Sequence, residues 1–295
     1  MPKGRKYLVA ARGPIYQWRM QSRLPLSVAV ITLNEEVNLP RCLGSIRDLA
    51  AELVIVDSGS TDRTQEISRQ MGALFIAQPW LGFTRQKNFA LERCSQPWAL
   101  CLDADEAVSP ELAEAIRRAF ASPPSVNGFE LNRRTSYLGK WIWHAWYPEW
   151  CLRLVRREAA RWAGADPHPS LSVTGATAKL SGDLLHYSYG DLQEHLERTL
   201  RYARTSADTM ALAGRRCCWY HLVISPWFAL GKRLILKQGF RDGWRGWIIA
   251  YSSFLAVFAK YAFLAEQQRL AQRRPQPPTD LPTGTSSASR PPGPA

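Results

Sequence analysis

Several short motifs that mark common enzyme classes are missing from this 295-residue chain. It has no Gly-x-Gly-x-x-Gly fingerprint, no phosphate-binding P-loop, no Gly-x-Ser-x-Gly and no internal repeat. These absences argue against a dinucleotide-binding domain, a P-loop nucleotide hydrolase, an α/β-hydrolase and a solenoid.

Cysteines are few, and their spacing does not indicate a structural role. The six cysteines form no Cys-x-x-Cys pair, and Cys101 lies in a segment expected to be a buried strand. The pattern favours reduced thiols in the cytosol over zinc binding or a disulfide framework. Composition is otherwise ordinary, since 46% hydrophobic and 21% charged residues predict a folded protein with one sizeable core and a small appendage.

A long apolar run is also lacking. Residues 247–259 form a run of 13 residues closed by Lys260, fewer than the roughly 20 that a spanning helix needs. Their helical spacing predicts a helix that lies on the membrane or packs on its neighbour. Residues 215–245 carry seven basic side chains and one acidic one among aromatic rings, and no nucleic-acid-binding signature accompanies them. Despite a net charge of +13, we therefore expect an anionic membrane surface as partner and no nucleic acid.

Three short aliphatic runs end abruptly in polar or acidic residues, as buried parallel strands do. The runs are residues 26–32, 53–57 and 100–103. Residues 39–46 and 67–71, on either side of the second run, show helical spacing. Alternating strands and helices predict a doubly wound α/β sheet, in which the loops after the strands converge on one ligand-binding crevice.

Carboxylates at these strand ends suggest the chemistry. Asp103 and Asp105 are one residue apart, so a bend after the strand can direct both toward one hard cation, Mg²⁺ or Mn²⁺, whose shell is completed by water and phosphate oxygens. A diphosphate leaving group would supply such oxygens. Asp57 ends its own strand and can accept a hydrogen bond from a base or a ribose.

These segments resemble the successive nucleotide and metal motifs of family 2 glycosyltransferases. The matching motifs are residues 32–36, 56–64, 82–88 and 103–105, and the resemblance runs from about residue 26 to 185 and resumes at 240–246. Within the family, the chain is most similar to the group related to the lipopolysaccharide core β-1,4-glucosyltransferase. The resemblance implies the GT-A fold, a Rossmann-like, mostly parallel sheet flanked by helices, and an inverting enzyme.

The resemblance also assigns roles to individual residues. It implies donor-binding roles for Thr32, Asn34 and Glu35 beside the nucleoside, Asp57 on uracil or ribose, Lys87 near the diphosphate, and Asp103. It implies a metal site formed by Asp103, Asp105 and His168. Asp166 stands in an acid-Pro-His sequence where some relatives have Val-His-Glu, and it becomes the candidate catalytic base. In the family's Arg-x-aromatic-Arg-Arg segment, here 153–157, Val155 replaces the usual Phe.

We therefore expect a metal-dependent hexosyltransferase that moves a sugar, glucose by the resemblance, from a UDP-sugar to a lipid-linked saccharide such as a lipopolysaccharide core. It would act in the cytoplasm, peripherally on the inner face of the membrane. One alternative keeps the fold but changes the acceptor to a polyprenyl phosphate or an exopolysaccharide. The other is a non-catalytic protein that binds nucleic acid or membrane.

Composition along the chain predicts its organisation. We expect a basic N-terminal tail (1–23), a catalytic domain (24–185), a helical basic-aromatic region (186–270) and a disordered Pro-rich tail (271–295). Met1 and Met20 are both possible starts.

One more segment, residues 141–150, is rich in aromatic side chains. Residues 141–150 hold four tryptophans and a tyrosine, which suit the apolar faces of sugar rings. We expect an acceptor-side loop there, although each single tryptophan could equally belong to the core.

Overall fold

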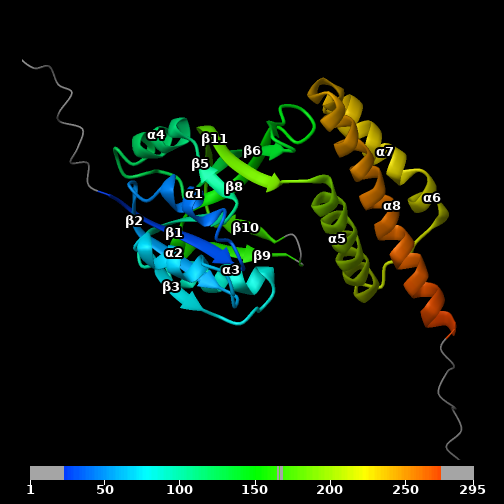
Figure 1. The fold of residues 1–295 in the computed structure, drawn as a ribbon, viewed down its shortest axis with the longest axis horizontal. Helices are drawn as coiled ribbons and strands as arrows, with labels where there is room; N and C mark the ends of the chain where they lie inside the picture. Colours follow the sequence, from blue (N-terminus) through cyan, green and yellow to red (C-terminus); the bar gives the residue numbers. More distant parts are fainter. Residues whose placement is uncertain (1–22, 165, 167–168, 274–295) are drawn as a thin grey trace, which may run out of the picture.

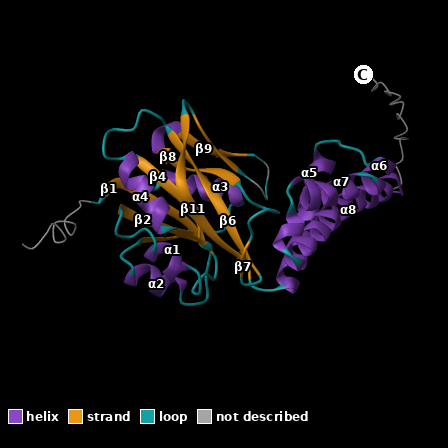
Figure 2. Ribbon diagram, turned by 90° about the horizontal axis from the view of Figure 1, so that it is seen from above, coloured by secondary structure: helices purple, strands orange, loops and turns teal. Residues whose placement is uncertain are grey.

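A computed structural model describes residues 23–164, 166 and 169–273 of the chain. A mixed sheet with flanking helices forms one part, and a group of helices from the C-terminal third lies beside it (Figures 1 and 2). This is the α/β architecture of the GT-A type with a helical appendage that the sequence predicts.

The sheet contains nine strands among the described residues, in the order β3-β2-β1-β4-β8-β6-β11-β5 with β7 beside β6. The strands are β1 (Leu24–Thr32), β2 (Ala50–Asp57), β3 (Leu74–Ala77), β4 (Trp98–Asp103), β5 (Glu106–Val108), β6 (Gly128–Tyr137), β7 (Lys140–Trp141), β8 (Glu149–Arg156) and β11 (Thr177–Tyr189). Strands β3, β2, β1 and β4 are parallel, so their carboxyl ends share one edge.

Burial on both faces explains why these parallel strands are almost continuously apolar. Along β1, Val28 and Val30 belong to one buried cluster, whereas Ala29 between them belongs to the cluster on the opposite face. Four helices flank the sheet: α1 (Leu39–Gly44), α2 (Thr64–Gln70), α3 (Phe83–Glu92) and α4 (Pro110–Ala119). The predicted strands at 26–32, 53–57 and 100–103, and the helices between them, are confirmed.

The other half of the sheet is built mainly from antiparallel pairs. Strand β8 runs antiparallel to both β4 and β6, and it thereby brings the 149–156 segment next to the acidic end of β4. After β8, the short helix η2 (Arg157–Ala159) leads into a separate two-stranded ribbon, β9 (Ala160–Ala163) and β10 (Ser170–Val173). This ribbon carries the loop that contains Asp166.

The C-terminal third of the described chain is helical. It comprises α5 (Leu192–Leu212), α6 (Trp219–Val223), α7 (Ser225–Gly231), η3 (Lys232–Leu236), η4 (Gly239–Asp242) and α8 (Trp244–Arg273). The long helices α5 and α8 lie side by side (Figure 1).

Helix α8 corrects one sequence expectation, the length of the 247–259 helix. It is 30 residues long, because the residues after Lys260 are good helix formers without Gly or Pro. By length and composition its segment Trp244–Gln272 is a candidate membrane span, and 28% of its most apolar window is buried inside the protein.

Two further expectations concern segment boundaries. The predicted division after residue 185 falls inside β11, which continues to Tyr189. Nearly all of the predicted N-terminal tail and of the predicted disordered C-terminal tail, together with Met1 and Met20, lies outside the described residues.

Candidate active site

Parallel pairing brings polar side chains from three strands to one sheet edge. In the strand register Thr32 lies opposite Asp57, and Ile31 lies opposite Asp103. The ends of β1, β2 and β4 are therefore neighbours, as in other open α/β sheets where ligands bind at this edge.

Asp57 organises the turn that follows β2. Its side chain is 3% exposed, and one oxygen accepts the backbone N–H groups of Gly59 and Ser60 at 2.9 and 2.8 Å. The other oxygen accepts the hydroxyls of Thr32 at 2.8 Å and Ser60 at 2.5 Å. A carboxylate has about four acceptor positions, so these four bonds use them within the protein. A direct contact of Asp57 with a nucleoside stays a prediction.

The loop after β1 is joined to the loop after β2. Asn34 has a φ of +57°, which Asn adopts more readily than most residues, and its side-chain oxygen accepts the Thr61 N–H at 2.9 Å. The Glu35 N–H donates to the Thr64 hydroxyl at 2.8 Å. Burial raises the pKa of Glu35, and the nearby Asp105 carboxylate adds to this shift while Asn38 opposes it. The predicted donor-binding residues of both loops are therefore contiguous.

Asp103 is the centre of an ion-pair cluster at the end of β4. One oxygen accepts from Lys87 Nζ at 2.5 Å, and the other accepts from Arg153 Nη2 at 2.9 Å. Burial alone would raise the pKa of Asp103, but the Lys87 ammonium and the Arg153 guanidinium outweigh it and lower this pKa well below its usual value. The carboxylate is thus held ionised between two cations.

Lys87 is held in place by α3 and β9. Its ammonium lies 4.5 Å from the ring centroid of Trp162, within cation–π distance. Asn88, the next residue, exchanges two 2.9 Å hydrogen bonds with the backbone of Trp162. These contacts fix the helix face that carries Lys87 toward Asp103.

Arg153 extends the cluster into the sheet. It donates to Glu106 Oε1 at 2.8 Å, and Glu106, fully buried, also accepts from Arg133 at 3.3 Å. Arg133 in turn binds Glu149 at 2.7 Å. No sequence motif indicated a role for Glu106, Arg133 or Trp162, and Arg153 stood out only as part of the 153–157 segment. The position of Glu106 directly after Asp105 was the available signal.

Asp105 has a different neighbour, His186 on β11. The distance from His186 Nε2 to Asp105 Oδ2 is 3.3 Å, and the side chains are 14% and 20% exposed. The other ring nitrogen, Nδ1, lies 3.2 Å from the Thr135 hydroxyl, a contact of the kind that orients metal-binding histidines. His186 was not among the predicted site residues.

The resemblance implies a divalent cation near these carboxylates. Within the described ranges, no three His, Cys, Asp or Glu side chains form a ready metal cluster. The Asp105 carboxylate nevertheless suits Mg²⁺ or Mn²⁺, which commonly take only one or two protein ligands and complete their shell with water and phosphate oxygens. The His186 imidazole is a softer ligand, and it suits Mn²⁺ better than Mg²⁺. Asp105 therefore fits either ion and His186 fits Mn²⁺, whereas both oxygens of Asp103 are already paired with cations. His168, the third predicted ligand, lies outside the described residues.

Asp166 lies at the beginning of α3. Its carboxylate accepts the N–H of Phe83 at 3.0 Å, the N–H of Thr84 at 3.1 Å and the Thr84 hydroxyl at 3.0 Å. Gly82 has a φ of +91°, and a Cβ there would lie 2.6 Å from Asp166 Oδ2, so only glycine permits this approach. The predicted base therefore caps the helix that carries Lys87.

The tryptophans of the 141–150 loop divide between core and surface. The Trp146 ring packs at 5.3 Å from Tyr137, next to His195, whereas the Trp143 ring is 50% exposed. The Trp141 ring lies 5.3 Å from Tyr187, whose N–H donates to the backbone carbonyl of Asp105. The predicted acceptor-side loop thus lies against the segment that carries the candidate metal ligands.

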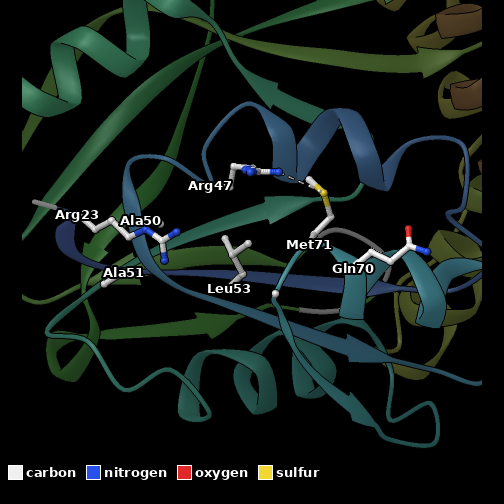
Figure 3. A pocket seen from close by; sticks show the side chains of 8 residues that line it. Arg23, Arg47, Ala50, Ala51, Leu53, Gln70 and Met71 are labelled. Atoms are coloured by element: carbon white, nitrogen blue, oxygen red, sulfur yellow. Dashed lines mark hydrogen bonds between the residues drawn. The ribbon is translucent and has the colours of Figure 1, made fainter. Parts of the chain in front are cut away.

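A surface pocket of about 210 Å³ lies at the opposite edge of the sheet (Figure 3). It is lined by Arg23 directly before β1, by Arg47 between α1 and β2, by the start of β2, and by the end of α2 with the turn that follows it, including Met71. Because the acidic strand ends lie at the other edge, this pocket is separate from the candidate site.

Comparisons with known proteins agree with this geometry. A family model described as glycosyl transferase family 2 matches residues 27–174. The chain is 33% identical to the lipopolysaccharide core biosynthesis glycosyltransferase LpsC of Rhizobium meliloti, over 83% of this chain and 92% of that protein. An uncharacterized glycosyltransferase of Rickettsia typhi is 28% identical over 83% of this chain and 87% of its own.

Solved structures are more distant. The mannosyltransferase PcManGT from Pyrobaculum calidifontis, in complex with GDP-Man and Mn²⁺, is 17% identical with a TM-score of 0.48, over 86% of this chain and 89% of that one. Glucosyl-3-phosphoglycerate synthase from Mycobacterium tuberculosis is 16% identical with a TM-score of 0.43, over 66% of this chain and 84% of that one.

Proposed function

The chain belongs to glycosyl transferase family 2 and is a glycosyltransferase. From this premise we propose that it transfers glucose from UDP-glucose to a lipid-linked saccharide, with inversion at the anomeric carbon. The acceptor we propose is a lipopolysaccharide core, because a relative 33% identical over most of the chain carries that description. A polyprenyl phosphate or an exopolysaccharide as acceptor is the alternative.

The observation that carries the proposal is the ion-pair cluster around Asp103. Lys87 and Arg153 bring two cations to the sheet edge where nucleotides bind, and Asp103 holds both by one bond each. When a nucleoside diphosphate arrives, these cations can also face its phosphates, because each has further donor hydrogens. Preorganised cations of this kind stabilise the charge that develops on a leaving UDP.

We propose Asp105 as a protein ligand of the divalent cation, Mg²⁺ or Mn²⁺, joined by His186 when the ion is Mn²⁺. The ion, when bound, neutralises negative charge on the departing diphosphate. Thr135 would keep His186 Nε2 directed at the site through its contact with Nδ1.

Asp166 remains the proposed base that accepts the proton of the acceptor hydroxyl. Its position at the N-terminus of α3 places a carboxylate on the helix that carries Lys87. A base bound to that helix would be fixed relative to the cations that face the leaving group. The roles of Thr32, Asn34, Glu35 and Asp57 in donor binding are part of the same proposal.

The membrane surface is the proposed partner of the C-terminal helices. Large apolar side chains of α6, α7 and η3 point outward, with Trp219, Trp227, Phe228 and Leu236 each more than 60% exposed. The last turns of helix α8 bind polar groups of the α5 segment, including an Arg204–Glu266 ion pair of 3.1 Å. Shallow, peripheral binding to the inner face fits both observations.

The test combines a donor screen with a matched pair of variants. UDP- and GDP-sugars are screened by thermal shift with Mg²⁺ or Mn²⁺, because a ligand at 100 times its Kd adds about 2.7 kcal/mol to stability. We expect UDP-glucose to stabilise the wild type and Arg85→Met but to have little effect on Lys87→Met, since Arg85 is on the same helix outside the ion pairs of Asp103. Equal stabilisation of both variants, or stabilisation by GDP-sugars alone, would contradict the donor proposal.

A further inference from the structure

The 138–147 segment, which overlaps the predicted acceptor-side loop (141–150), is held by charged residues from the C-terminal helices. These residues are Arg233 at η3, Asp242 at the end of η4 and Arg245 at the start of α8, and we refer to them as the clamp. Arg233 and Arg245 were among the basic residues expected to face a membrane, but both bind backbone carbonyl groups of the protein instead.

Asp242 makes the central contacts of the clamp. Its carboxylate, only 4% exposed, accepts the N–H of Trp143 at 3.0 Å, of His144 at 3.1 Å and of Ala145 at 2.7 Å. His144 Nδ1 lies 3.1 Å from the same carboxylate. Three consecutive N–H groups that converge on one anion require a specific backbone turn, so the carboxylate fixes the course of the chain at 143–145.

The two arginines fix the loop on either side of that turn. Arg245 donates from Nε and Nη2 to the carbonyl of Leu138, at 3.1 and 2.8 Å. Leu138 has a φ of +48°, a conformation that a branched side chain seldom adopts without support from its surroundings. Arg233 donates to the carbonyl of Ala145 at 2.9 Å.

The clamp itself is rigidly built. Gly239 and Gly246 lie so close that a Cβ on Gly246 would overlap the Gly239 carbonyl oxygen. A Cβ on Gly239 would in turn lie 2.6 Å from the Arg233 carbonyl oxygen. Glycine at both positions therefore allows η3, η4 and α8 to approach each other and to present the three charged side chains together.

The loop connects the clamp to the candidate site. Ile142 and Ala145 are buried, so the fixed turn exposes the Trp143 ring, which packs at 5.6 Å from Tyr147 and lies under the Arg134 guanidinium at 4.4 Å. On its other side the loop contacts Tyr187, because the Trp141 ring packs against the Tyr187 ring. The backbone N–H of Tyr187 donates a hydrogen bond to the backbone carbonyl of Asp105. An exposed aromatic ring at this point suits the apolar face of a sugar.

We propose that Asp242 is a positioning residue for the acceptor: it fixes the 143–145 turn so that Trp143 is presented at the acceptor side of the site. This inference rests on the proposed function for the identity of the ligand. The geometry of the turn can be tested without any substrate.

The first measurement is amide hydrogen exchange of the substrate-free protein. We expect exchange at residues 143–145 to become roughly tenfold faster or more in Asp242→Asn, because an amide side chain cannot accept on both of its atoms. The matched control is Asp208→Asn, which removes a carboxylate that joins α5 to α8 through Gln267 and does not contact the loop. Equal exchange at 143–145 in all three proteins would overturn the positioning role.

The second measurement is kinetic, with UDP-glucose as donor and core oligosaccharide from a rough-type lipopolysaccharide as acceptor. Asp242→Asn should raise the acceptor KM roughly tenfold and leave the donor KM within about twofold, whereas a general structural defect would change both. Trp143→Ala should have the same effect alone and add little to Asp242→Asn.

If Asp242→Asn does not fold, Trp143→Ala decides, because its ring is exposed and an unchanged acceptor KM would overturn the proposal. If the wild type transfers no sugar, the proposed function fails, while the exchange measurement still decides whether Asp242 fixes the loop.

Discussion

Replacement of Asp166 by Asn separates its two possible roles, helix cap and catalytic base. The carboxylate accepts from the N–H of Phe83 and from both the N–H and the hydroxyl of Thr84. In Asp166→Asn the amide oxygen can keep the Phe83 bond. The amide nitrogen can donate to the Thr84 hydroxyl, whose own proton goes to the Gly164 carbonyl at 3.2 Å. Only the Thr84 N–H then loses its partner.

The expected costs of the two roles differ widely. One lost hydrogen bond costs about 1–2 kcal/mol, and Asn is nearly as good an N-cap as Asp. A loss of this size lowers Tm by only a few degrees, at roughly 2–4 °C per kcal/mol for a domain of comparable size. A general base contributes roughly 10²- to 10⁴-fold to the rate, and an amide cannot serve as one. We therefore expect turnover to fall by about 100-fold or more with a small change in Tm.

The assay measures transfer from UDP-glucose, UDP affinity by calorimetry, and Tm for each variant. Thr84→Val is the control, because it removes one bond to Asp166 and leaves the carboxylate in place. If Asp166→Asn keeps turnover within about threefold of the control, Asp166 is a cap and the base lies elsewhere. An equal loss of UDP affinity would instead assign it to the donor side.

Three more outcomes follow from other parts of the molecule. Asp105→Asn and His186→Ala should each lower turnover by about 100-fold or more and weaken the dependence of activity on added Mn²⁺. Full activity of the wild-type protein in excess chelator would show that the reaction needs no metal ion. The full chain should cosediment with anionic but not neutral vesicles and be released by high salt, because the attraction of lipid headgroups is worth about 1 kcal/mol per basic residue. Retention on the vesicles after alkaline carbonate washing would instead identify an integral membrane segment. Burial, aided by the positive charge of Arg198, lowers the pKa of His195 from 6.5 to about 4. The folded protein therefore favours the neutral imidazole, and the resulting contribution to the free energy of unfolding is fully present above pH 6.5. Roughly 3 kcal/mol of it should be lost as pH falls toward 4. In urea titrations His195→Phe should lose stability at neutral pH but flatten this slope, and an unchanged slope would refute the assignment.

Much of the fold was available in the sequence because its signals are local. Aliphatic runs that end in acids mark β1, β2 and β4, and the pairing of parallel strands then requires Thr32, Asp57 and Asp103 to meet at one edge. The length of α8 was underestimated for the same reason. An apolar run shows where a helix is most hydrophobic, whereas its last turns are polar and are held against α5 by contacts such as Arg204–Glu266.

The partners of the acidic residues depended on the tertiary structure. Arg153 reaches Asp103 because the antiparallel strand β8 lies next to β4, and His186 reaches Asp105 from β11, 81 positions along the chain. The sequence determined that carboxylates gather at the carboxyl edge, since strand period and direction are local properties. Which cations and histidines meet them there was decided by strand order and crossover, and those depend on contacts between residues far apart in the chain.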